Sequence, residues 1–266
     1  MKLFQIVTIY SLTALIGLCV GSFLNVVIYR VPKNMSLIKP PSHCPKCGYF
    51  LRWYDNVPVL SYLFLGGKCR KCREHISFRY TAVELINTVL WGLCIFLFWN
   101  KSIPFACIAA VASSVFLCVF FIDLEHKLIF DRFVLILLAL GVASMFLDPD
   151  FGWRSHLIGG ISGFVAFYLI ALAFRLIRHK EGLGGGDIKL TAVAGLLLGW
   201  QRLILSILIA SISASVVLLI LTYRAKKKQN EQDIEYPFAP FLTTAFLISL
   251  FFGSAILSFY LGLLGF

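Results

Sequence analysis

Charged residues are scarce in this sequence of 266 residues: they make up 14% of it, and only 13 are acidic. Hydrophobic residues make up 59%, and the mean hydropathy is +0.87, which excludes an ordinary soluble globular domain. Apolar runs recur at lengths close to the ~20 helical residues that cross a bilayer. They predict an all-α polytopic membrane protein with about eight transmembrane helices. The predicted spans lie near residues 4–28, 81–99, 103–121, 132–147, 155–177, 188–200, 203–223 and 238–264.

Motifs of several other protein classes are also missing. The first apolar run lacks a basic leading segment and a small-residue cleavage pattern, so we expect a retained span and not a signal peptide. The glycine-rich segment 182–187 follows no strand, which excludes a dinucleotide-binding fingerprint, and no Gly-Lys-Ser/Thr follows it, which excludes a phosphate-binding loop. The sequence has no internal repeat and no low-complexity linker.

Basic residues are distributed unevenly between the two sides of the predicted bundle. Alternating the spans places segments 30–80, 122–131, 178–187 and 224–237 on one side. Together with the edge residues Arg132, Arg175 and Lys189, this side holds 20 of the 24 Lys and Arg residues. The positive-inside rule assigns this side to the cytoplasm and both termini to the outside. The net charge of +11 is then a consequence of topology and of contact with the lipid bilayer, so nucleic acid is not expected as a partner.

Four of the eight cysteines form two pairs in the basic segment 30–80. Cys44 and Cys47 are separated by two residues, as are Cys69 and Cys72, and 21 residues lie between the pairs. This two-knuckle pattern predicts a structural zinc ion held by four thiolates in a small zinc-ribbon-like loop. Two disulfides are the alternative, which a reducing cytosol disfavours. His43 and His75 flank the knuckles as substitute ligands, and Cys19, Cys94, Cys107 and Cys118 are expected to be small buried hydrophobes.

Two aspartates stand where apolar runs meet polar loops, and these are the candidate catalytic residues. Asp123 ends one run, and Asp187 follows three glycines and precedes another run. Carboxylates at the edge of a membrane are expensive and therefore functional candidates. Two carboxyls on one side predict a dyad that shares one proton and hydrolyses a membrane-inserted peptide. The alternative for Asp187 is an N-cap of a helix beginning at Ile188.

Other acids compete with this pair. Asp131 is the reserve candidate for Asp123, although a salt bridge or a helix start suits it better. Asp148 and Asp150 are interpreted as acids of an outer loop. Glu84 and Asn87 are expected to face the bundle interior or the cytoplasmic boundary, where other helices satisfy them or they contact substrate.

The ordered set of motifs resembles the type IV prepilin peptidases, bacterial inner-membrane aspartyl proteases of the GxGD class. The resemblance rests on Gly21–Pro32, the cysteine pairs, Asn56–Tyr62, Ile76–Tyr80 with Glu84, Ile122–Leu124 and Gly184–Leu190. It implies cleavage of the basic leader of prepilins and pseudopilins, the substrates of type IV pilus and type II secretion systems, at the cytoplasmic membrane face. The resemblance assigns catalysis to Asp123 and Asp187. It also implies methylation of the new N-terminus with S-adenosylmethionine, without indicating the donor-binding residues.

The resemblance divides the chain into a first span (1–29), a cytoplasmic zinc-binding segment associated with methylation (30–80) and a multi-span peptidase domain (81–266). Two positions depart from the family pattern: Phe130 replaces the usual proline before Asp131, and Ala239 replaces a glycine. The alternatives are a peptidase without methylation, a non-enzymatic zinc-ribbon scaffold of a secretion machine, and a transporter with a proton relay. A transporter would carry its acids at mid-span, and a scaffold leaves both aspartates unexplained.

Overall fold

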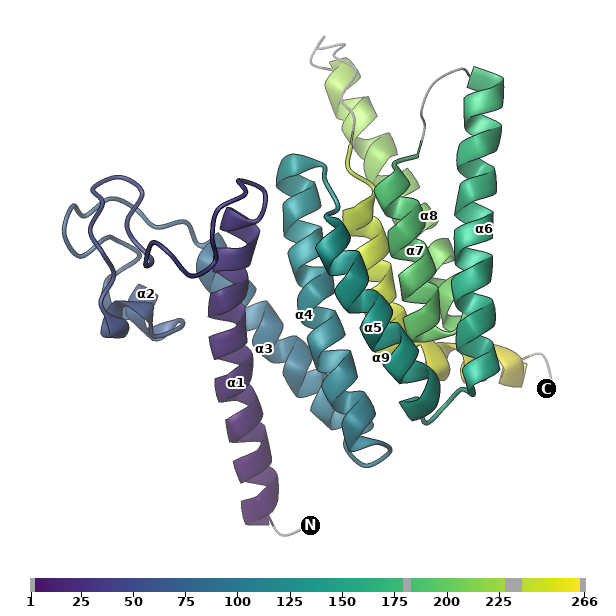
Figure 1. The fold of residues 1–266 in the computed structure, drawn as a ribbon, viewed down its shortest axis with the longest axis horizontal. Coiled ribbons are helices and arrows are strands. Elements are labelled where there is room, and N and C mark those ends of the chain that lie inside the picture. Colours follow the sequence, from purple (N-terminus) through teal and green to yellow (C-terminus); the bar gives the residue numbers. More distant parts are fainter. Residues whose placement is uncertain (1–2, 179–182, 228–235, 264–266) are drawn as a thin grey trace. The chain divides into compact units, whose positions relative to one another are not determined.

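The computed structural model describes residues 3–178, 183–227 and 236–263 of the chain (Figure 1). Across these ranges the secondary structure is helical, with no strand and only two isolated bridges. The chain divides into two compact units, residues 1–99 and residues 100–266.

The first unit consists of two long helices and the loop segment between them. α1 (Leu3–Arg30) packs along α3 (Arg79–Phe98), and the loop holds a 3-10 turn, η1 (Trp53–Asn56), and the short α2 (Leu60–Phe64). The two long helices approach closely at Gly21, where an added Cβ would lie 2.7 Å from the Cα of Glu84. Small residues at a helix crossing let two backbones meet in this way, as in other membrane bundles.

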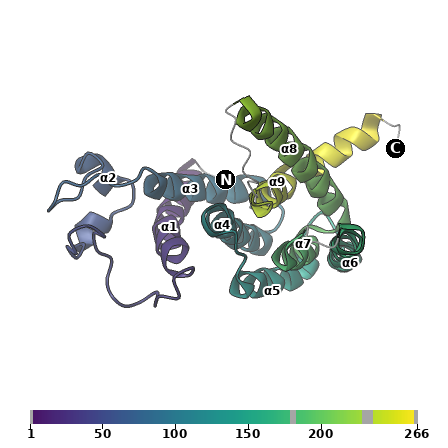
Figure 2. The ribbon, with the colours of Figure 1, turned by 90° about the horizontal axis from the view of Figure 1, so that it is seen from above.

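The second unit is a six-helix bundle. Its helices are α4 (Ile103–His126), α5 (Asp131–Leu147), α6 (Trp153–Arg178), α7 (Gly185–Leu198), α8 (Trp200–Lys227) and α9 (Ala239–Leu263). α4 is the most buried of the long helices and contacts both α5 and α9, while α7 lies between α5 and α6. Seen from above, α9 lies between α4 and α8 (Figure 2). The end of α4 and the starts of α5, α7 and α9 lie at the same end of this bundle (Figure 1).

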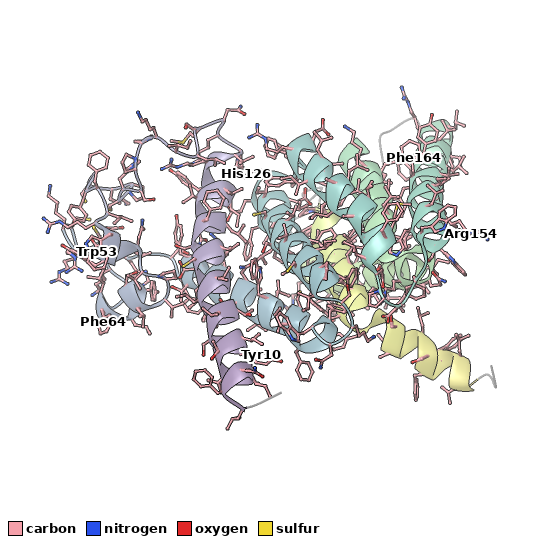
Figure 3. The ribbon with its side chains drawn as sticks, turned by 60° about the horizontal axis from the view of Figure 1, so that its bottom comes forward. Tyr10, Trp53, Phe64, His126, Arg154 and Phe164 are labelled. Carbon is pink, nitrogen blue, oxygen red and sulfur yellow. The ribbon has the colours of Figure 1, made fainter. Side chains whose placement is uncertain are left out.

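All eight predicted spans are helices in the structure, with bounds close to the predicted ones. Six of them, α1, α3, α4, α6, α8 and α9, are long and apolar enough to cross a membrane. α5 has 17 residues and α7 has 14, so the count of eight spans stays a prediction. Large apolar side chains, such as Phe164 of α6, project outward from the helices (Figure 3), as expected for a polytopic protein whose solvent is lipid.

Candidate active site and metal centre

Asp123 lies in the last turn of α4 and is buried, with 6% of its surface exposed. The helix ends three residues later, where Lys127 adopts a left-handed conformation and its N–H donates to the Asp123 carbonyl at 2.9 Å. The backbone N–H of Ala239, the first residue of α9, donates to the Asp123 carboxylate, and Lys127 supplies a nearby positive charge. Asp123 is therefore fixed by the start of a helix more than 110 residues further along the chain.

Asp187 lies in the first turn of α7, which begins at Gly185 and not at Ile188. The N-cap is Gly184, so the prediction that Asp187 caps the helix as its N-cap residue is wrong. Its carboxylate instead accepts a hydrogen bond from the Gly184 N–H, as the third residue of a capping box does. The helix N-terminus attracts this carboxylate, whereas its burial opposes ionisation.

Of the three glycines before Asp187, Gly186 serves close packing. None of the described glycines of this tract adopts a left-handed conformation. An added Cβ at Gly186 would lie 2.9 Å from the Cβ of Ile129, in the connection between α4 and α5. The tract therefore brings the α7 N-terminus against the loop that follows Asp123.

The two carboxyls, 64 positions apart in sequence, interact with each other. Burial raises the pKa of Asp187 to about 7, and the negative charge of Asp123 is the next largest cause. A like charge raises the pKa of a carboxyl only when the two are neighbours. The structure thus brings Asp123 and Asp187 together at one end of the bundle.

Asp131 starts a helix and forms a salt bridge, which are the roles that sequence analysis favoured for it. It is the first residue of α5 and is exposed, and its carboxylate pairs with Lys189 of α7 at 2.7 Å. This ion pair joins the start of α5 to the first turns of α7, beside Asp187.

The four cysteines of the loop segment converge. The sulfur atoms of Cys44, Cys47, Cys69 and Cys72 all lie within 4.8 Å of one another, and two of the distances are 3.8 and 3.9 Å. A tetrahedral zinc ion with Zn–S bonds of about 2.3 Å separates its sulfurs by about 3.8 Å, so the set fits a metal ion. His43 and His75 are not among the converging ligands.

The protonation behaviour of these thiols also fits a cation. The backbone N–H groups of Cys72 and Lys71 donate to the Cys69 sulfur and lower the pKa of that thiol to about 7. At Cys72 the backbone N–H of Glu74 lowers the pKa, but burial and the three neighbouring sulfurs raise it more, to about 12. Four thiolates this close repel one another unless a cation lies between them.

A buried acid that sequence analysis did not single out supports the metal centre. Asp55 accepts hydrogen bonds from Arg70 at 2.7 Å, and from the Arg52 N–H and the Tyr49 hydroxyl at 3.2 Å. Burial by itself raises the pKa of Asp55, but these donors lower it below its usual value. Because Arg70 follows Cys69 and Tyr49 closely follows Cys47, Asp55 ties the two knuckles together. The available signal was that Asp55 is one of only two acids in a strongly basic segment, residues 30–80.

Asp148 and Asp150 are not simple loop acids, as sequence analysis expected. Arg202 of α8, 1% exposed, donates to Asp148 at 2.7 Å and to Asp150 at 2.6 Å, and the Asp148 side chain is fully buried. His156 Nε2 lies 3.5 Å from the same Asp148 oxygen. This cluster closes the opposite end of the bundle, where α5 ends and α6 begins. The sequence signal that could have indicated this cluster was Arg202, an arginine at the start of a long apolar run.

Glu84 and Asn87 face the interior of the first unit, as predicted. The Glu84 carboxylate accepts the Val59 N–H at 2.8 Å, and Asn87 donates to the Gly17 carbonyl at 2.8 Å. Val59 has a φ of 60°, which is strained for a β-branched residue, so Glu84 anchors the loop segment to α3 through a constrained position.

The remaining cysteines follow the prediction only in part. Cys94 and Cys118 are buried, whereas Cys19 and Cys107 are exposed on the outer faces of their helices.

Comparison with known proteins covers both units. Residues 15–98 match the family model of the bacterial peptidase A24 N-terminal domain, and residues 110–220 match that of the type IV leader peptidase family. A prepilin leader peptidase/N-methyltransferase of Pseudomonas aeruginosa is 34% identical over 96% of this chain and 94% of its own length. Proteins of the same name from Myxococcus xanthus and Neisseria gonorrhoeae are 38% and 32% identical, over 86% and 88% of this chain and 69% and 87% of their own lengths. None of the solved structures matches the chain. With these similarities spanning both aspartates and the cysteine centre, the chain belongs to the type IV leader peptidase family.

Proposed function

We propose that this protein is a membrane aspartic endopeptidase that removes the leader peptide of prepilins or pseudopilins and methylates the new N-terminus. The names and coverage of its relatives support both activities. The observation that carries the peptidase proposal is the pair of carboxyls of buried Asp123 and half-buried Asp187, which interact at one end of the second unit.

In the proposed mechanism, one proton is shared between the two carboxyls. The ionised carboxylate removes a proton from water as the water attacks the scissile carbonyl carbon. The protonated carboxyl donates to the carbonyl oxygen as negative charge develops there. A proton then passes to the leaving amine, and the C–N bond breaks. The Ala239 N–H holds the Asp123 carboxylate in place, and the Gly184 N–H does the same for Asp187.

We assign zinc to the four cysteines as a structural ion. Four thiolates leave no open coordination position, so the ion would fold the loop and take no part in hydrolysis. A loop segment of about fifty residues buries little core by itself, which is the usual reason for such an ion.

Methylation requires a methyl donor, which the relatives' names imply and which we take to be S-adenosylmethionine. It would supply a methyl group to the amine freed by cleavage. The second unit has an apolar groove formed by α4, α8 and α9. This groove does not fit the charged methyl donor, because no charged side chain lines it. We therefore assign no donor-binding residues.

The proposed location is the bacterial inner membrane. The excess of basic residues on the side of segment 30–80 favours the cytoplasm for the cysteine centre and for both aspartates. In this proposal residues 1–29 form the first span, residues 30–80 form the zinc-binding segment, and residues 81–266 form the peptidase domain. Both proposed catalytic aspartates, Asp123 and Asp187, lie in the peptidase domain, after residue 100.

The test is cleavage and methylation by the purified protein in liposomes, with a full-length prepilin and radiolabelled S-adenosylmethionine. We expect Asp123→Ala and Asp187→Ala to abolish cleavage while the protein still inserts. Glu125→Ala, an exposed acid two residues from Asp123, is the matched control and should cleave normally. Full activity in either aspartate variant would remove that acid from the mechanism, and cleavage without label transfer would restrict the protein to a peptidase.

A further inference from the structure

An apolar groove with a volume of about 360 Å³ lies in the second unit, next to Asp123. α9 forms its floor, with Phe241, Thr244 and Ile248 among the residues facing it. Phe120 of α4 forms one wall, and Ile209 and Ser213 of α8 form the other. Figure 2 shows the same order of helices, with α9 between α4 and α8.

We infer that this groove binds the apolar helix of the substrate, on the carboxyl side of the cleaved bond. The inference rests on the proposed peptidase function and identifies how the enzyme would recognise a membrane-anchored substrate. The argument depends on the position of the groove, its direction and its chemistry.

One end of the groove lies next to Asp123. It begins at Pro240 and Phe241, directly after the residue whose N–H holds the Asp123 carboxylate. On the other wall, Phe120 and Leu124 of α4 bracket Asp123 in sequence. A peptide held at Asp123 can therefore extend into the groove.

The direction of the groove suits a chain that enters the membrane. The floor residues Phe241, Thr244, Ala245 and Ile248 follow helical spacing along one face of α9. This stretch extends about 10 Å from the catalytic end toward the middle of the helix, about two helical turns. A substrate cut at the membrane face must continue into the bilayer on one side of the cleaved bond, and this face follows that path.

The chemistry of the groove suits a helix. No charged side chain lines it, and its two hydroxyl groups are satisfied within their own helices: Thr244 donates to the Pro240 carbonyl at 2.7 Å and Ser213 to the Ala210 carbonyl at 3.1 Å. Ser213 and Ala245 are small, which allows a helix to approach closely and gain van der Waals contact where lipid offers no hydrophobic driving force.

The experiment narrows the groove and compares two substrates. Ile209→Trp places a large side chain in one wall, and Leu208→Trp, on the exposed neighbouring position of α8, is the matched control. Each variant is assayed in liposomes with a full-length prepilin and with a short soluble peptide that spans the cleavage site and lacks the apolar helix. We expect Ile209→Trp to raise KM for the full-length prepilin about tenfold, which corresponds to a loss of about 1.4 kcal/mol in binding. Cleavage of the short peptide should be unchanged, and the control should behave as the parent with both substrates.

Photo-crosslinking supplies the second measurement. A photoreactive residue at position 248 should crosslink to the prepilin, and one at position 208 should not. Capture of lipid alone at position 248, an unchanged KM for Ile209→Trp, or equal loss on both substrates would overturn the inference. These outcomes differ from failure of the proposed function, in which the parent protein would cleave neither substrate. If the short peptide is too poor a substrate to measure, the crosslinking result decides.

Discussion

Replacing Gly159 by alanine tests whether the contact between α6 and α7 positions Asp187. The added Cβ would lie 2.5 Å from the carbonyl oxygen of Gly195 and 2.8 Å from the nitrogen of Trp200. Cβ atoms keep at least 3.0 Å from such atoms, so α7 must move by about 0.5 Å. Both neighbours are backbone atoms, and no change of rotamer relieves the clash.

The cost follows from this displacement. Overpacking of this kind costs about 1–3 kcal/mol, and alanine regains up to about 1 kcal/mol of helix propensity, which leaves a net loss of about 1–2 kcal/mol. Because α7 carries Asp187, and a 1 Å misplacement can reduce a rate about 100-fold, we expect kcat to fall about tenfold with little change in KM.

The assay measures initial rates of prepilin cleavage in liposomes and thermal unfolding by tryptophan fluorescence. Gly92→Ala in α3 is the control, because an added Cβ there meets no atom within 4 Å. A Gly159→Ala protein with the parent's kcat and unfolding temperature would refute the claim that close backbone packing of α6 on α7 sets the position of Asp187.

Three further predictions address the dyad, the metal centre and the far end of the bundle. Because the pKa of Asp187 is raised to about 7, cleavage should fall about tenfold per pH unit above pH 7, as the pair loses its shared proton; a rate that stays constant to pH 9 would contradict this. Cys69→Ser should lose the zinc measured in the parent protein by metal analysis and should make the loop segment sensitive to trypsin; retention of one zinc per chain would argue against four-cysteine ligation. Arg202→Met leaves Asp148 buried without its main partner and should lower the free energy of unfolding by about 3–5 kcal/mol, measured by thermal unfolding. The control is Arg154→Met, at an exposed position of α6 (Figure 3), which should change this free energy little. Equal unfolding temperatures of the two variants would show that the buried cluster does not stabilise the bundle.

The helices could be predicted from sequence because each apolar run is bounded by charged or glycine-containing loops. The exact start of α7 was missed, since Gly184 serves as the N-cap and the first turn contains Asp187 itself. The exposure of Cys19 and Cys107 was missed for a different reason. A helix that is apolar all round carries no periodic signal of which face meets its neighbours, because lipid and protein interior are equally apolar.

The buried ion pair of Arg202 with Asp148 shows the same limit for polar residues. A charged residue at the end of a span can lie in an exposed loop or in a buried charge cluster. The packing of α5, α6, α8 and α9 decides that these side chains are buried. This packing brings together residues that are more than 50 positions apart in the chain.

Composition and the spacing of four cysteines were enough to predict a helical membrane protein and a four-cysteine cluster that could hold a metal ion, because these depend on residues close together in the chain. The convergence of Asp123 with Asp187 and the groove beside them arose only in the tertiary structure. The convergence depends on close contacts at Gly159, Gly186 and Ala239, whose partners lie elsewhere in the chain. Local sequence sets where each helix begins and ends, but only packing decides which helix ends meet.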